Sequence, residues 1–152
     1  MNDLAKQGHL TIHENPEIRK QIMEFQETML NGIKSGDLKE VPSQLNHYFA
    51  PGMYARELFI PKGTLYVGKI HKHPHIRVIS KGSVSILTEE GDIFQKAPCT
   101  MVTPAGAKRI GFAHEDTVIT TIHLTNETDL DKIEEEIIAK DYDELLPRLE
   151  EH

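Results

Sequence analysis

Three histidines, His71, His73 and His75, alternate with other residues at the end of the stretch from Gly68 to His75. Alternate residues of a β-strand point to the same face, so this spacing predicts three imidazoles on one side of a strand. Neutral imidazoles gathered on a rigid element are ligands that divalent transition metals prefer. The stretch therefore predicts a metal site with these three histidines as ligands, for Fe, Mn, Ni or Zn.

A straight strand cannot bring all three side chains to one ion. Alternate residues of a strand are about 6.6 Å apart, whereas two nitrogens bound to one metal are about 3 to 3.5 Å apart. The imidazoles of His71 and His73 can converge, and His75 can join them only if Pro74 turns the chain back. Binding by all three histidines therefore requires a short hairpin at Pro74.

Other polar residues are candidates for chemistry on a bound molecule. Arg56 and Glu57 are neighbours in a predicted strand and so point to opposite faces. Glu57 is the early carboxylate that could serve as a general acid or base if its face is turned to the site. His114 is expected in a turn, and His123 in the core or in the wall of a pocket.

The elements that must position these residues are mainly short strands. Turn signals recur between residues 47 and 124 at intervals of roughly 8 to 12 residues, which is typical of an antiparallel sandwich or barrel. The predicted strands are Met53–Ile60, Leu65–Lys72, His75–Ser80, Ser83–Leu87, Asp92–Gln95, Thr100–Thr103, Lys108–Phe112 and Val118–Leu124.

A helix is predicted on each side of this region. Asn15 and Pro16 form a helix start, and apolar residues then recur on one face up to about Gly36. A second helix begins at Thr128-Asp129 and carries an apolar stripe of Leu130, Ile133, Ile137 and Leu145. The expected organisation is a helical extension over residues 1–46, with a linker at 37–44, a barrel over 47–124 and a helix within 125–152.

Composition limits the class of protein. A chain of 152 residues is expected to form one domain, and its single cysteine, Cys99, allows no internal disulfide. The net charge of −7 argues against nucleic acid as a partner. No apolar run is long enough for a membrane span and the first residues lack a signal-peptide core, so we expect a cytosolic protein. Exposed sheet edges and amphipathic helices favour a homodimer.

The region from residue 47 to 124 resembles the cupins, small β-barrel proteins with two motifs, G-x5-H-x-H-x3,4-E-x6-G and G-x5-P-x-G-x2-H-x3-N. His71-Lys72-His73 matches H-x-H, Gly82 matches the closing glycine, and Pro104-Ala105-Gly106 matches P-x-G. His75 stands where the cupins have their metal-binding Glu. The resemblance implies a cupin-like antiparallel β-barrel, a double-stranded β-helix or jelly roll, flanked by the two helices. The whole chain also resembles uncharacterised small cupins encoded by tailed phages and prophages.

The second motif departs from the cupin pattern. Pro98 replaces the opening Gly, Arg109 replaces the third metal-binding His, and Ala113 replaces the Asn. An arginine in the barrel would hold a carboxylate or phosphate, and it would also repel a bound cation. Two readings of Arg109 therefore stay open, as a substrate anchor beside a metal or as a residue that excludes the metal.

Two functions follow from these alternatives. The first is a metal-dependent enzyme that acts on a small anionic molecule, with His71, His73 and His75 as ligands, Arg109 as anchor and Glu57 as acid or base. The second is a non-catalytic cupin that binds a small ligand or serves a structural or interaction role. The three histidines favour the first function, and the altered second motif favours the second.

Overall fold

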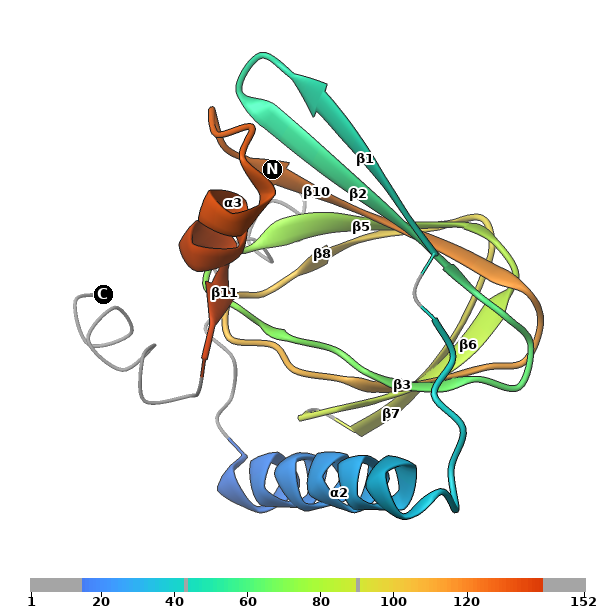
Figure 1. Ribbon diagram of the computed structural model, residues 1–152. Helices are drawn as coiled ribbons and strands as arrows, with labels where there is room; N and C mark the ends of the chain where they lie inside the picture. The colour runs from blue at the N-terminus through green and yellow to red at the C-terminus, as the bar shows by residue number, and fades with distance from the viewer. Residues whose placement is uncertain (1–14, 43, 90, 141–152) are drawn as a thin grey trace.

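The computed structural model describes residues 15–42, 44–89 and 91–140 (Figure 1). The helices in these ranges are α2 (Pro16–Ser35) and α3 (Leu130–Ile137). The strands are β1 (Gln44–Ala50), β2 (Met53–Ile60), β3 (Leu65–Val67), β4 (Ile70–His71), β5 (His75–Lys81), β6 (Ser83–Thr88), β7 (Gly91–Lys96), β8 (Cys99–Thr103), β9 (Ile110–Ala113), β10 (Thr117–Leu124) and β11 (Ile138–Ala139).

Within the described residues, the strands form a five-stranded sheet in the order β1-β2-β10-β5-β8 and a four-stranded sheet in the order β3-β9-β6-β7. A short pair, β4 with β11, lies at one end of the barrel, and the strand pairs are antiparallel. The chain crosses between the two large sheets from β2 to β3, from β3 through β4 to β5, from β5 to β6, from β7 to β8 and on either side of β9. Such crossings are those of a jelly roll. The structure therefore confirms the predicted cupin-like antiparallel barrel with a helix on each side.

The core lies between the two large sheets. Its buried members come from both of them, so the sheets close on each other as the two faces of one barrel. The buried members are Ile60, Ile79, Val84, Ile86, Ala113 and Ile119. Alternation along each strand sends these β-branched and small residues inward and leaves the intervening residues to the outer faces.

Two strand predictions were wrong in an informative way. Residue 44 was assigned to a linker, but β1 begins there and pairs with β2 from Gln44 to Ala50. The predicted strand Leu65–Lys72 is divided into β3 and β4, because β3 pairs with β9 in the four-stranded sheet while β4 pairs with β11. The chain thus changes its pairing partner from β9 to β11 immediately before His71.

The C-terminal helix is shorter than the sequence predicted. Asp129 caps α3, accepting from the amides of Asp131 and Lys132, as expected. The helix ends at Ile137 because the next residues join β4 as strand β11, and the amide of Lys72 donates to the carbonyl of Ile137 at 2.7 Å. Leu145, predicted on the apolar stripe of this helix, lies outside the described residues.

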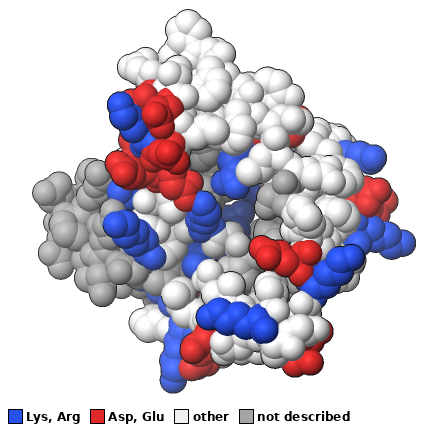
Figure 2. Space-filling model, in the orientation of Figure 1, with Lys and Arg blue, Asp and Glu red and all other residues white. Residues whose placement is uncertain are grey.

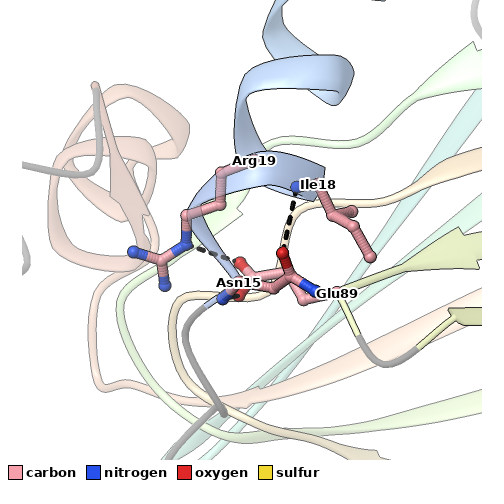
Figure 3. Close-up of polar contacts among 4 residues, drawn as sticks. All are labelled: Asn15, Ile18, Arg19 and Glu89. Atoms are coloured by element: carbon pink, nitrogen blue, oxygen red, sulfur yellow. Dashed lines mark hydrogen bonds and ion pairs between the residues drawn. The ribbon is translucent and has the colours of Figure 1, made fainter.

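Helix α2 forms as predicted and packs under the four-stranded sheet (Figure 1). The Asn15 side chain accepts from the amide of Ile18 at 3.2 Å, and Ile22 is fully buried. Glu89, at the β6–β7 turn, binds both the guanidinium Nε of Arg19 at 2.7 Å and the amide of Asn15 at 3.2 Å (Figure 3). A buried carboxylate therefore ties the start of the helix to the barrel. Of the described helices, none is long and apolar enough to cross a membrane.

The outer face of the five-stranded sheet carries several exposed apolar side chains alongside polar residues such as Asn46 and Glu57. Residues that alternate with the inward side chains leave much of their surface exposed, from 38% for Val102 to 87% for Leu124. The others on this face include Tyr48, Met53 and Ile76. The homodimer stays a prediction of the sequence, and this sheet face is the surface on which we expect a second copy to pack.

Gly82 is the position where a methyl group should damage the barrel most. It connects β5 to β6 with a φ of +87°, and a Cβ there would overlap the hydroxyl of Thr117 and the carbonyl of Asp116. We expect Gly82→Ala to lower the free energy of unfolding by about 3 kcal/mol, since the left-handed backbone costs about 1 to 2 kcal/mol and overpacking about 1 to 3 kcal/mol.

Urea unfolding of the Gly63→Ala variant provides the control. Gly63 has a similar φ of +81°, but no atom lies within 4 Å of the position that its Cβ would take. Gly63→Ala should therefore lose only the backbone contribution of about 1 to 2 kcal/mol. Equal losses in the two variants would show that the contact of Gly82 with the β10 start is unimportant.

Candidate functional site

Strand β10 lies between β2 and β5, and its inward side chains set three layers across the five-stranded sheet. Residues in each layer are strand partners or contact one another, and the layers differ sharply in chemistry. The apolar layer is Leu58, Ile119, Ile79 and Cys99; the cationic layer is Arg56, Thr121, Arg77 and Met101; the imidazole layer is Tyr54, His123, His75 and Thr103. The barrel interior thus passes from an apolar floor to a polar mouth.

A cavity of about 290 Å³ occupies the cationic layer and reaches the imidazoles. Its wall includes the guanidinium groups of Arg56, Arg77 and Arg109, together with Lys69, and no aspartate or glutamate belongs to the described lining. Figure 2 shows basic side chains around and inside a hollow on this face of the molecule. Three guanidinium groups without a carboxylate among them produce a positive potential that attracts anions.

Arg77 is the most deeply buried of these cations, with 6% of its surface exposed. Its Nη1 donates to the side-chain carbonyl of Gln95 and lies 3.7 Å from the sulfur of Met101. Both partners are neutral, and among the described residues Arg77 forms no ion pair. A buried guanidinium with only neutral partners lacks the counter-charge that usually offsets the loss of hydration.

Arg109 reaches the same cavity from the opposite side of the barrel, immediately before β9. Its carbonyl accepts from the amide of Gly68 at 2.8 Å, which fixes the backbone beside the strand switch between β3 and β4. Tyr66 lines the cavity too, and its ring lies directly against Gly111 of β9, where any Cβ would overlap it. Burial raises the pKa of Tyr66, and the charges of Arg77 and Arg109 oppose that rise.

Thr103 adds a second unsatisfied group to the cavity wall. Its side chain is 3% exposed, and its hydroxyl has no hydrogen-bond partner in the described part of the chain. A buried hydroxyl without a partner costs about 1 to 3 kcal/mol, and a bound molecule that accepts or donates here would recover that free energy. Thr103 and Arg77 therefore point to a ligand with polar, negatively charged groups.

Three imidazoles cluster at the mouth of the cavity, but they are not the three that the sequence predicted. The ring centroid of His71 lies 4.3 Å from that of His75 and 5.6 Å from that of His123, and His75 and His123 are 4.8 Å apart. The rings come from β4, β5 and β10. We call this group, His71, His75 and His123, the imidazole cluster.

The cluster is uncharged at neutral pH. Burial is the main cause of a low pKa in each ring, lowering that of His71 to about 2, His75 to about 4 and His123 to about 3. Neighbouring cations add to the effect, with Arg56 acting on His71 and His123, and Arg109 and Arg77 acting on His75. The cluster therefore holds neutral imidazoles, which can accept a proton or bind a metal.

The imidazole nitrogens of the cluster are donors that a metal ion would accept, but the three rings are not arranged around a common point. His123 Nε2 lies 2.9 Å from the hydroxyl of Thr121, and His75 Nδ1 lies 3.4 Å from the carbonyl of His73, so each ring has one nitrogen turned to the protein. Across residues 15–42, 44–89 and 91–140, no three or more His, Cys, Asp or Glu side chains form a group that could hold a metal ion.

The structure separates the predicted site residues into two sets. His71, His75 and Arg109 line the cavity, whereas His73 lies exposed in the turn that Pro74 makes between β4 and β5. The chain does turn back at Pro74, but the turn carries His73 outward while bringing His75 to His71. The expectation of one strand face with three alternating imidazoles is corrected in this respect.

Glu57 also lies away from the cavity. Arg56 occupies the inward face of β2, so its neighbour faces outward, where Glu57 Oε1 accepts from Asn46 at 3.1 Å and from Tyr48 at 3.4 Å. This placement corrects the expectation that Glu57 is the acid or base of the site. Alternation in a strand allowed either neighbour to face inward, and the sequence alone did not decide between them.

Arg56, Arg77 and His123 are the functional candidates that the sequence interpretation missed. Each lies at an inward position of a strand that was predicted correctly, so their alternation with buried apolar residues was the available signal. His123 was assigned to the core or to a pocket wall, and it lines the hollow beneath α3; its contacts with two other imidazoles were not predicted.

Helix α3 covers the mouth from outside. Lys69 forms an ion pair with Glu134, and the Lys72 ammonium donates to the Glu135 carbonyl at 2.7 Å. A second hollow of about 440 Å³ lies beneath the helix and shares Arg56, Lys69 and His71 with the first. The two cavities are therefore neighbours across the cationic and imidazole layers.

The fold and the site together define a cupin-like barrel with a cationic interior. No protein-family model and no curated protein matches this sequence. Similar solved structures include a cupin-2 domain protein from Shewanella frigidimarina (14% identity, 63% of this chain and 92% of that chain, TM-score 0.45) and KdgF from Halomonas (15%, 61% and 88%, 0.49). Salicylate 1,2-dioxygenase from Pseudoaminobacter salicylatoxidans is also similar (10%, 72% and 32%, 0.48). Likeness at this level carries no conclusion about activity.

Acidification should destabilise the protein through the imidazole cluster. The folded pKa values lie below the usual 6.5, so the unfolded chain takes up protons that the folded chain does not as the pH falls below 6.5. Stability is therefore complete above pH 6.5 and is lost progressively toward pH 4. Replacing His75 by Gln should reduce the loss between pH 7 and pH 5 by about 1 to 2 kcal/mol.

Urea unfolding of chelator-treated protein at several pH values measures this effect. His114→Gln is the matched control, since His114 is exposed and lies outside the cluster, bonded to Ser85 at 2.6 Å. A pH dependence that is the same in both variants would contradict the role given to the buried cluster.

Proposed function

We propose that the protein binds a small organic anion in the barrel cavity and acts on it, with the arginines as anchors and the imidazole cluster as the group that exchanges protons. The observation that carries the proposal is the buried Arg77, which has neutral hydrogen-bond partners and no ion pair in the described chain. A carboxylate bound in the cavity would supply the counter-charge, and Arg109 is placed to share it.

The remaining wall residues favour a ligand that is more than a bare anion. Leu58, Val67 and Ile119 provide an apolar part of the wall, and Thr103 and Thr121 provide hydroxyls. A small carboxylic acid with a short carbon skeleton matches both kinds of surface, because its acidic group can meet the guanidinium groups while its carbons contact the aliphatic side chains. The cavity volume of about 290 Å³ limits the ligand to a small molecule.

The cluster gives this binding site a chemical capacity. A neutral imidazole beside a bound acid can accept a proton from it, and the positive charge that forms is stabilised by the nearby carboxylate. The bound anion also offsets the charges of Arg77 and Arg109, which help to lower the pKa of His75. Ligand binding should therefore raise that pKa toward neutral, the range in which a general base is most effective.

Arg77→Met tests the anchor. We expect the variant to bind butyrate and inorganic phosphate at least about 10-fold more weakly than the wild type, since a hydrogen bond to a charged group contributes about 1.5 to 3 kcal/mol. The variant should remain folded, because replacing a buried charge with an apolar side chain is often neutral or stabilising. Isothermal titration calorimetry measures the affinities, and thermal unfolding measures stability.

Lys96→Met is the matched control, because Lys96 is exposed and lies outside the cavity lining. It removes one positive charge without touching the site and should leave the affinities within about 2-fold, as expected for a screened surface charge. Failure of the wild type to bind any small carboxylate or phosphate, or equal weakening by both variants, would contradict the proposal.

A metal-dependent enzyme is the second candidate, and the adjacency of three neutral imidazoles supports it. If bound, a divalent ion such as Fe, Mn, Ni or Zn would polarise an oxygen of the ligand. We expect protein purified without a histidine tag to contain about one equivalent of such a metal per chain, and His71→Ala with His123→Ala to abolish it. His73→Ala is the control and should retain the metal. Metal-free wild type that takes up no ion on titration would defeat this candidate.

A further inference from the structure

The cationic groups of the cavity fall into two separate positions. Arg56 on β2 and Arg77 on β5 are both partners of Thr121, which lies on the strand between them. Neighbouring strands are about 4.8 Å apart, so the backbones of the two arginines are about 10 Å apart across the sheet. Arg109 comes from the other side of the barrel and joins Arg77 near Tyr66.

The effects of the arginines on their neighbours agree with this division. Arg56 lowers the pKa of His71 and His123, at the mouth, whereas Arg77 and Arg109 lower the pKa of His75 and act on Tyr66. The two positions are thus an inner pair, Arg77 with Arg109, and an outer cation, Arg56, which also lines the neighbouring cavity.

The two separated backbone positions favour a ligand with more than one acidic group. A single carboxylate offers two oxygens that match one or two guanidinium groups at one point, whereas the cavity has positive groups on both sides of Thr121. The described lining contains no acidic side chain that could neutralise the second position. The neighbouring hollow that Arg56 also lines includes Asp131 and Glu134, of which Glu134 is paired with Lys69. Within the cavity itself, the counter-charge for Arg56 would come from the ligand.

We propose that the ligand of the cavity is a small dicarboxylate, with one carboxylate held between Arg77 and Arg109 and the other held by Arg56. This inference rests on the anion-binding function proposed above and specifies its substrate class. Thr121 lies between the two arginines in the sheet, with its hydroxyl 2.9 Å from His123 Nε2, and Thr103 lines the same cavity. The imidazole cluster then contacts the half of the molecule nearest the mouth.

Calorimetry with chain-matched acids tests this proposal. The probes are the dicarboxylates succinate, glutarate and adipate, each compared with the monocarboxylate of equal carbon number: butyrate, pentanoate and hexanoate. We expect at least one dicarboxylate to bind the wild type 10-fold or more tightly than its partner, since a second charge-assisted contact contributes about 10- to 150-fold in affinity.

Two variants assign the carboxylates to their arginines. Arg56→Gln should remove the preference for the dicarboxylate while leaving monocarboxylate binding within about 2-fold, and Arg77→Met should weaken both classes. Arg56→Lys, which keeps the charge but loses the planar fork, should retain part of the preference. Lys96→Met again serves as the control for a lost surface charge, and circular dichroism shows whether each variant is folded.

The outcomes separate this inference from the function on which it rests. Equal binding of mono- and dicarboxylates by the wild type, or a preference that survives Arg56→Gln in a folded protein, would overturn the dicarboxylate assignment and leave the anion site intact. No binding of either class would overturn both. A preference that is lost in Arg56→Gln and retained in Lys96→Met supports the assignment.

Discussion

The register of β10 between β2 and β5 is the constraint on which the rest of the site depends. The inward residues of β10 are Ile119, Thr121 and His123 in turn. At each of these positions, β2 and β5 must supply partners of matching chemistry at the same level of the sheet. A shift of β10 by one residue would turn Thr121 and His123 outward and place Thr120 and Ile122 inside the barrel. The apolar layer holds that register, since Ile119 packs with Ile79 and Ile60 in the core. Packing at the floor therefore fixes the chemistry at the mouth.

The burial of positive charge in this barrel has a clear physical logic. Arg77 has lost most of its hydration and keeps only neutral partners, which is unfavourable for stability but leaves its charge available to a ligand. An aspartate beside it would stabilise the folded chain and occupy the site. The whole chain has a net charge of −7, yet the described cavity lining contains no acidic side chain. The acidic side chains therefore lie elsewhere on the molecule. The anion site that we propose would therefore lower the stability of the folded chain.

Much of the fold followed from the sequence because it is encoded locally. The turn residues and the alternation of side chains gave β2 its bounds from Met53 to Ile60, and Asn15 with Gly36 gave the ends of α2. The missing strand β1 has a different cause: its position is decided by pairing with β2, a contact between segments that local patterns do not reveal. The early end of α3 has the same origin in the pairing of β11 with β4.

The candidate site was only partly predictable for related reasons. The sequence favoured convergence of His71 with His73, whereas the ring beside His71 is that of His75, and the third imidazole, His123, comes from a strand nearly fifty residues away in the sequence. Alternation shows that two residues share a face, yet it does not show whether that face is inner or outer. The sequence interpretation therefore chose Glu57 as the inward residue, whereas Arg56 is the one that lines the cavity. The sheet register supplies that information, and the register is a property of the whole barrel.

The contact between Tyr66 and Gly111 gives the barrel a simple means of changing what it accepts. The Tyr66 ring occupies the space that a side chain at residue 111 would fill. A larger residue there would push the ring either into the cavity or out of the cavity wall. Residue 111 therefore influences the width of the cavity through Tyr66, although residue 111 is not part of the cavity lining. A chain with the same arginines but a different residue at this position would accept ligands of another size. Specificity in such barrels can therefore change through a residue that does not contact the ligand.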